Sequence, residues 1–485
     1  MTARLRETMH ASAESVAPYD LYAGALAKAR RHRRRRQWVA AATATTVLAL
    51  LAVIAPPLAR TAPAPVAPVD PSIPPTPSLP AKIGAPLWGT PEVTDDPIGP
   101  ASVAFGSGQW WWGESTGVTA LVGSSTDSYG IVRSNYATRA GEHVLLSPDG
   151  ALLATKDGVA DLRTGTVTKL PDLDAPLAIP QAWSADRRYL AVVAYKTTWI
   201  TLSNGVQTIA AATATLHMVE VSTGHHLKIA ELPTVGNYDG WTAAFAQTGG
   251  GLLAYQSENQ ISVVTPGGGL VSRFDVDPGV RLAGKGAWTP DGGGLMLLRQ
   301  RQCCVTDAYE SRWKLFAVDA QTGKPRATPA VPELPELAAV RLLGWTKAGE
   351  PVITALYPEP GAAVVGFGAR DRTLSFSSSH PADYSRVRSA RVVALAEDGI
   401  QRVLVRGSDE DVLSIDVAEA AIASGLMRPG HPPTGLGPYL RWALMILAGG
   451  AVLVLAAVIL LVIRIGGRRR RRPRSPLSRP SPPPR

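Results

Sequence analysis

A short turn motif recurs through the middle of this 485-residue chain and limits the folds that the chain can adopt. Each copy has an apolar residue, a small or hydroxyl residue, two turn residues and usually a glycine, and an apolar run follows it. The copies lie at 146–150, 183–187, 245–249, 288–292, 345–349 and 395–399. Helical periodicity is almost absent between them, so the sequence predicts a repeated all-β unit.

The best-preserved copies contain the residues that a tight hairpin turn needs. Proline fixes φ, aspartate bonds its own backbone, and glycine accepts a positive φ. We expect the large residue before each turn to point inward and fill the space between neighbouring units. The signature residues of the motif are Ser147, Pro148, Asp149, Gly150, Trp183, Asp186, Trp288, Pro290, Asp291, Gly292, Trp345 and Gly349.

A second turn follows in several units, at 161–165, 221–224, 264–267 and 318–323. Two hairpins per unit give four strands, which is the blade of a β-propeller. Residues 103–135 supply a candidate further blade, and a strand at 411–416 could pair with an N-terminal strand to close the ring. The sequence therefore predicts a mainly β fold, a β-propeller of about seven blades, with six as the alternative, flanked by two transmembrane helices.

The turns of the Trp-Ser-Pro-Asp-Gly kind, each followed by an apolar strand, resemble those of TolB-type and WD40-like β-propellers. The span of these repeats is about 70% of the chain. The resemblance implies a fold but no particular function, because propellers serve many functions. The copies at 245–249, 345–349 and 395–399 keep little beyond the final glycine. The layout with two apolar runs also resembles membrane-anchored propeller proteins of actinobacteria.

Two uncharged apolar runs flank the repeats, at 38–55 and 442–463. Each is close to the roughly 20 helical residues that cross a bilayer. Residues 1–37 contain 9 Lys or Arg, and residues 464–485 contain 9 Arg. Because basic flanks stay in the cytoplasm, both termini should be cytoplasmic and the middle should lie across the cell membrane.

The expected organisation follows from these runs. It comprises a cytoplasmic basic segment (1–37), a transmembrane helix (38–57), a Pro-rich linker (58–84), an extracytoplasmic propeller (85–425), a linker (426–438), a second transmembrane helix (439–463) and a cytoplasmic, basic, disordered tail (464–485). An alternative makes the first run a cleaved signal peptide, which leaves the middle on the same side.

The distribution of charge excludes a nucleic-acid reader. The chain has a net charge of +10, but the region between the two tails holds 31 basic and 36 acidic residues. A nucleic-acid-binding domain would carry the positive excess on its folded surface. We expect the basic tails to contact anionic lipid instead.

Few residues suggest chemistry, and we predict no catalytic residue, cofactor or metal site. The Gly113–Gly117 segment matches a nucleophile-elbow pattern, but a strand-like run rather than a helix follows it. Trp110, Trp111 and Trp112 are possible ligand contacts, with core packing as the alternative. Adjacent Cys303 and Cys304 could form a disulfide, pair with another chain, or be small buried residues.

Three functions remain open from the sequence. The first is a two-pass, membrane-anchored extracytoplasmic propeller that binds a protein or cell-envelope ligand without catalysis. The second is a hydrolase- or lyase-like enzyme with its site in the propeller channel. The third is a transmembrane sensor that signals through a cytoplasmic helix at 20–30.

Overall fold

The computed structural model describes residues 76–433, together with residues 449–450. The gaps are residues 88, 108, 111–112, 115–116, 135–138, 202–206, 233–241, 249–250, 302–305, 308–311, 328–330, 360–362, 365–386, 398 and 410. The propeller belongs to one compact unit, Pro71–Gly435, and the rest of the chain forms a second unit. The two predicted transmembrane helices and the basic tails fall almost wholly outside the described residues. Within the described part, no helix is both long and apolar enough to cross a membrane.

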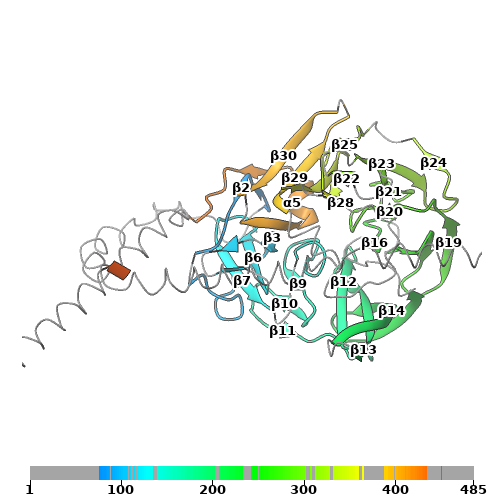
Figure 1. Ribbon diagram of the computed structural model, residues 1–485, viewed down its shortest axis with the longest axis horizontal. Coiled ribbons are helices and arrows are strands. Elements are labelled where there is room, and N and C mark those ends of the chain that lie inside the picture. The colour runs from blue at the N-terminus through cyan, green and yellow to red at the C-terminus, as the bar shows by residue number, and fades with distance from the viewer. Residues whose placement is uncertain are drawn as a thin grey trace, which may run out of the picture. The chain divides into compact units, whose positions relative to one another are not determined.

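The propeller has six blades of antiparallel strands arranged in a ring (Figure 1). Blade 1 consists of Leu145–Leu146 (β8), Leu152–Ala154 (β9), Val159–Asp161 (β10) and Val167–Thr168 (β11). Blade 2 consists of Leu177–Trp183 (β12), Tyr189–Thr201 (β13), Gln207–Glu220 (β14) and His226–Leu232 (β15). Blade 3 consists of Ala243–Phe245 (β16), Leu253–Ser257 (β17), Gln260–Val264 (β18) and Leu270–Asp275 (β19).

Blades 4 to 6 form the second half of the ring. Blade 4 consists of Val280–Leu282 (β20), Gly294–Arg301 (β21), Arg312–Asp319 (β23) and Pro325–Arg326 (β24), with Leu334–Pro335 (β25) also on β23. Blade 5 consists of Ala339–Trp345 (β26), Pro351–Pro358 (β27), Val387–Leu395 (β29) and Gln401–Gly407 (β30), with Lys82–Ile83 (β2) parallel to β30. Blade 6 consists of Val412–Val417 (β31), Ala101–Ser107 (β3), Val118–Gly123 (β6) and Tyr129–Arg133 (β7).

Three small pairs complete the described strands. They join Leu79–Pro80 (β1) to Met427–Arg428 (β32), Gln109–Trp110 (β4) to Gly113–Glu114 (β5), and Thr306–Asp307 (β22) to Ala363–Val364 (β28). One short helix, Glu419–Ser424 (α5), follows β31 and ends at Gly425, whose left-handed backbone stops it.

Blade 6 closes the ring by combining strands from both ends of the domain. Its first strand, β31, comes from the C-terminal end, and the other three come from the N-terminal end. This confirms the mainly β propeller, with the alternative count of six. The larger count was wrong because the copy at 395–399 is the second turn of blade 5, between β29 and β30, and does not begin a blade.

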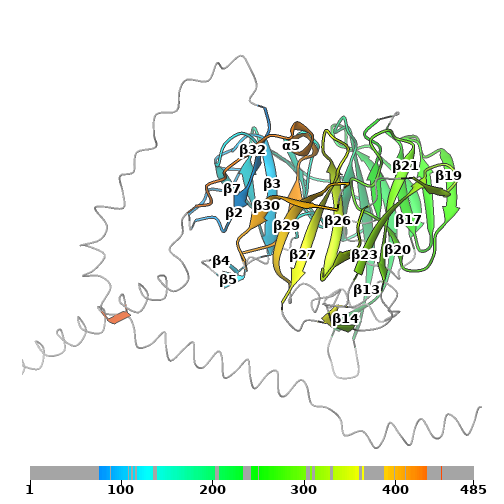
Figure 2. The same cartoon turned by 90° about the horizontal axis from the view of Figure 1, so that it is seen from above.

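The domain also extends beyond the predicted boundaries. Residues 79–83, expected in the Pro-rich linker, form β1 and β2, and residues 427–428, expected in the second linker, form β32. β1 and β32 run parallel, with Leu79 beside Met427. The two ends of the propeller therefore lie next to each other. In Figure 2, β32 and α5 lie along the same rim of the ring, and β4, β5 and the end of β14 lie at the opposite rim.

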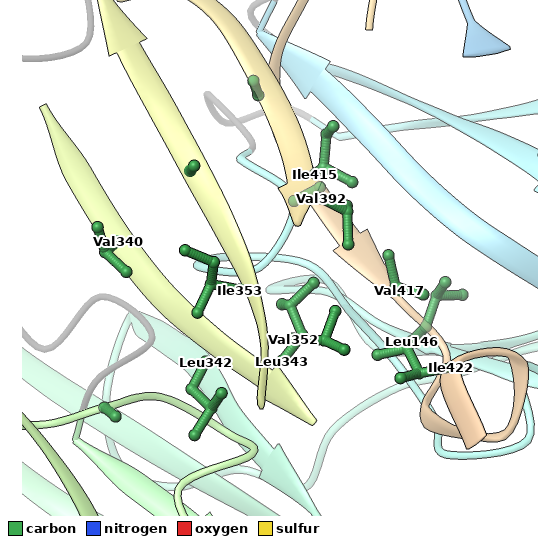
Figure 3. Close-up of a cluster of buried hydrophobic side chains, with 14 of the residues drawn as sticks. Leu146, Val340, Leu342, Leu343, Val352, Ile353, Val392, Ile415, Val417 and Ile422 are labelled. Carbon is green, nitrogen blue, oxygen red and sulfur yellow. The ribbon is translucent and has the colours of Figure 1, made fainter. Parts of the chain in front are cut away.

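The largest cluster of buried side chains is mainly aliphatic and packs between blades. Figure 3 shows side chains of β26, β27 and β29 beside Ile415 and Val417 of β31 and Ile422 of α5. Val340, Ile353, Val392 and Ile415 are almost fully buried. Full burial of one such side chain stabilises a fold by about 1.5–3 kcal/mol, so this packing holds the closing strand in place.

Candidate functional site at the centre of the ring

A buried group of charged side chains joins the innermost strands of the propeller. Asp416 on β31 has no exposed surface. Its Oδ2 accepts a hydrogen bond of 2.8 Å from the backbone N–H of Leu146 in blade 1. Its Oδ1 lies 2.8 Å from Nζ of Lys285, which follows β20 of blade 4. Asp416 therefore links three blades, and its partners compensate the cost of burying its charge.

Lys285 is held by a second bond to the same strand. Its Nζ donates to the carbonyl oxygen of Val417 at 2.8 Å, and its side chain is only 6% exposed. The backbone around it is fixed from the other side, because Gly286 N–H donates to Leu342 O and Leu342 N–H donates to Ala283 O. A buried ammonium needs such partners to stay charged.

A second set of charges lies where the segment before β8 meets blade 5. Glu142 is fully buried and forms ion pairs with Arg341 of β26 and with Arg139, whose NH1 lies 3.5 Å from Glu142 Oε2. Burial, together with neighbouring Arg139, lowers the pKa of Arg341 to about 9. Arg341 still carries its charge at neutral pH. Ser414 Oγ accepts a bond of 3.0 Å from Ala140 N–H and ties this segment to β31.

Glu419, the first residue of α5, is the remaining acid of the group. Burial raises the pKa of its carboxyl group to about 7, the charge of Asp416 adds to this effect, and Lys285 and a hydrogen bond from Gln247 oppose it. Its Oε2 is buried and has no hydrogen-bond partner among the described residues. The pKa of Glu419 is therefore raised into the neutral range.

These six side chains, Arg139, Glu142, Lys285, Arg341, Asp416 and Glu419, are called the central charge cluster below. The cluster holds three basic and three acidic groups, and most of its members are paired within the fold. The ion pairs of Lys285 and Arg341 link side chains of different blades and so hold the blades together. In the part of the chain that the structure describes, no group of three or more His, Cys, Asp or Glu side chains could hold a metal ion.

The signature turns lie around the rim on which α5 sits. Ser147 Oγ donates to Asp149 Oδ1 at 2.8 Å and accepts from Leu152 N–H at 2.9 Å. Ser184 and Asp186 repeat this pattern in blade 2, and Thr289 and Asp291 repeat it in blade 4. The carbonyl of Pro148 accepts a bond of 2.8 Å from Ala420 N–H, so the first turn also anchors α5. These signature residues therefore build the turns.

The signature tryptophans fasten blades 2, 4 and 5 to the preceding blade. The indole N–H of Trp183 donates to Leu145 O at 3.2 Å, and that of Trp288 donates to Ala244 O at 2.9 Å. Trp345 donates to Trp288 O at 2.7 Å and to Gly286 O at 3.0 Å. Each acceptor lies on or beside the preceding innermost strand. The inward orientation expected from sequence is therefore observed, with the indole group bonded across the blade boundary.

The other predicted positions lie almost wholly outside the described residues. Only the backbone of Trp110 is described, in β4, while Trp111, Trp112, Cys303 and Cys304 lie outside the described residues. The run after the Gly113–Gly117 segment forms strand β6, as the sequence predicted, so no helix follows the elbow pattern.

Sequence reasoning missed the central charge cluster, although a signal was present. Lys285 and Arg341 each stand alone among apolar and small residues, Ala283–Trp288 and Ala338–Gly344. A lone charge in a buried strand or next to one indicates an internal ion pair. The partner could not be read in the same way, because Asp416 is 270 positions from Leu146 in the sequence and meets it only in the closed ring.

Arg428 joins the incoming and outgoing ends of the domain. Its Nε lies 2.9 Å from Asp127 Oδ1, and its NH2 donates to Gly123 O at 2.7 Å and to Thr126 O at 2.9 Å. Its NH1 donates to Ser78 Oγ at 2.9 Å. These residues are called the end clamp below; Arg428 uses the whole guanidinium fork to fix both ends to the β6–β7 turn.

Asp127 also receives the outgoing segment. Its Oδ2 accepts from the backbone N–H of His431 at 2.8 Å and lies 2.7 Å from His431 Nδ1. Although burial opposes the effect, the bonds from Arg428 and His431 lower the pKa of Asp127. The carboxylate therefore stays ionised at neutral pH.

The six-bladed ring with its buried charge cluster defines the chain as a β-propeller. No protein-family model matches it, and no curated protein matches it. Among solved structures, it is similar to an oligogalacturonate lyase in complex with manganese (12% identity, 59% of this chain and 70% of that one, TM-score 0.35). It is also similar to TolB from Acinetobacter baumannii (14% identity, 60% of this chain and 65% of that one, TM-score 0.31).

A third similar structure is an acylaminoacyl peptidase, at 13% identity and a TM-score of 0.27, over 46% of this chain and 31% of that one. TolB proteins are thus among the structural neighbours, as the turn motif indicated. At these identities and TM-scores, the similarity concerns the propeller architecture alone.

Proposed function

We propose that this protein is a two-pass, membrane-anchored propeller that binds a protein or cell-envelope ligand on the far side of the membrane, without catalysis. The observation that carries the proposal is the pairing of β1 with β32, which brings both ends of the propeller together. Two apolar runs with basic flanks on their outer sides continue from these ends in the sequence. A ring whose ends leave at one place is suited to attachment by two neighbouring anchors.

Labelling of single cysteines in intact cells tests the topology. We would replace Cys303 and Cys304 by serine and introduce one cysteine at Leu270, which is 56% exposed on β19. A membrane-impermeant maleimide should label this position in intact cells. A cysteine at Ser12 in the basic N-terminal segment should react only after lysis. Labelling of residue 12 in intact cells, or protection of residue 270, would contradict the proposed topology.

A second candidate is catalysis at the centre of the ring, hydrolase- or lyase-like. The observation in its favour is the convergence of six ionisable side chains, including a carboxyl group with a pKa near neutrality. Turnover of peptide, ester or polyuronate substrates by the purified chain should then fall at least tenfold in a Glu419→Gln variant. Turnover that is absent, or that is insensitive to this substitution, would exclude the candidate.

A further inference from the structure

The short helix α5 docks on the ring through backbone hydrogen bonds and buried apolar side chains. Ala420 N–H donates to Pro148 O at 2.8 Å, and Ala418 N–H donates to Ser102 O at 3.0 Å. Ala421 and Ile422 are buried, and Ile422 lies near Gly344 at the end of β26. No side chain caps the helix N-terminus. The docking of a six-residue helix is therefore sensitive to the state of each buried group on it.

Glu419 is the buried ionisable group on this helix, and several elements face it. Lys285 of blade 4 and Asp416 of β31 are its charged neighbours, and Gln247 after β16 donates to it. Lys285 is already engaged, because its Nζ bonds Val417 O and pairs with Asp416. Two carboxylates thus lie near one ammonium group, while Arg341, which also interacts with Asp416, is paired with Glu142. An ionised Glu419 is left with an enclosed Oε2 that no donor of the described residues reaches.

We propose that Glu419 is a proton-binding site that latches α5 onto the ring. The protonated carboxyl group adds no second negative charge beside Asp416 and keeps the helix docked. Loss of the proton leaves a buried, incompletely paired carboxylate, which is costly in free energy. Movement of Glu419 into solvent removes this cost, and α5 moves with it.

The sign of the pH dependence follows from the pKa of Glu419, which is raised to about 7 from the ordinary value of 4.5. The docked state binds the proton more tightly than the undocked state does. Docking is therefore strongest below about pH 4.5 and weakens as the pH rises through 7. Above pH 7 both states are ionised, and the loss reaches its full extent.

The latch is placed to act on the outgoing end of the domain. Gly425 ends α5, and β32 begins two residues later at Met427. Arg428 of the end clamp follows directly. Release of α5 would loosen the segment that joins the ring to the C-terminal part of the chain. The proton site thus couples the centre of the propeller to its point of attachment.

Hydrogen exchange of the full-length protein in detergent tests the latch between pH 5 and pH 8.5. After correction for the intrinsic exchange rate, we expect protection of the Ala420 and Ile422 amides to fall about ten- to hundredfold as the pH rises, since each pKa unit corresponds to a factor of ten. The midpoint should lie near pH 7. A Glu419→Gln variant should stay protected throughout, because its neutral amide imitates the protonated acid.

Glu231→Gln is the matched control, because Glu231 is exposed and, among the described residues, pairs with Lys228 on the outer strand β15. It should keep the pH profile of the wild type. A wild-type profile without a transition between pH 5 and pH 8.5 would overturn the proposal, even if the Glu419→Gln variant failed to fold. A Glu419→Gln variant that retained the transition would overturn it as well.

Discussion

At the scale of single residues, Asp416 is a fully buried charged side chain that depends on its partners in other blades. Its carboxylate has no contact with solvent, yet it meets the ammonium group of Lys285 and the backbone of Leu146. Removing one member of a buried ion pair leaves the other charge uncompensated, which costs more than the pair itself contributes.

Substitution of Asp416 by asparagine should therefore destabilise the propeller by about 3–5 kcal/mol, since Lys285 keeps only Glu419 as a neighbouring acid. Chemical unfolding of the full-length protein measures this change. Asp174→Asn is the control, because Asp174 is 88% exposed in its pair with Lys196. We expect a change below about 1 kcal/mol for the control. Equal effects of the two substitutions would contradict the assigned role of Asp416.

Single residues also show which contacts can be predicted from the sequence. The first turn could be predicted because the hydrogen bonds that Ser147 forms with Asp149 and Leu152 span at most five positions. The partners of Asp416 and Arg341 could not, because closure of the ring brings them together. Local chemistry is visible in sequence, while pairing across the ring depends on blade order.

At the scale of the element, the signature glycines differ in what surrounds them. Gly150 and Gly349 have positive φ values of 72° and 82°. A Cβ at Gly150 would lie 2.0 Å from the backbone oxygen of Ala101 in blade 6, whereas a Cβ at Gly349 would meet nothing within 4 Å. The first turn is therefore packed against the closing blade, and the fifth is open.

A Gly150→Ala substitution should cost about 3 kcal/mol or more, because backbone strain adds to the clash between blades. Gly349→Ala should cost only about 1–2 kcal/mol, since it adds strain alone. Thermal unfolding of the two variants separates these effects. The same loss in both would mean that blade 1 and blade 6 can move apart without cost.

The element scale also explains the error in the blade count. The copy at 395–399 has a turn glycine, Gly399, with a positive φ of 82°, as the blade-starting turns do. First and second hairpins of a blade need the same turn chemistry, so the sequence alone does not distinguish them. Blade 6 lacks a first turn, since β31 leads into α5 and its partner β3 comes from the other end.

At the scale of the whole molecule, the end clamp holds the two ends of the ring together. Arg428 binds the β6–β7 turn and Ser78 at once through three nitrogen atoms. Lysine has one nitrogen on a flexible stem and cannot reproduce this fork.

An Arg428→Lys variant should thus lose the clamp while keeping its charge. We expect limited proteolysis at 76–83 and 425–433 to be several-fold faster than in the wild type. Arg406→Lys is the control, because Arg406 is exposed on the neighbouring strand β30 and pairs with Lys82 through its backbone. If both variants were cleaved at the wild-type rate, the clamp would have no role in holding the ends.

Blade 6 combines strands from both ends of the domain, and this affects the chain while it is being synthesised. A chain is made from its N-terminus, so β3 is synthesised about 300 residues before β31, the strand that covers its edge. Until then β3 presents unpaired backbone groups that can join a foreign strand. Chaperone protection should thus be needed until the last strand has been synthesised, and a message truncated before codon 412 should yield an aggregating product.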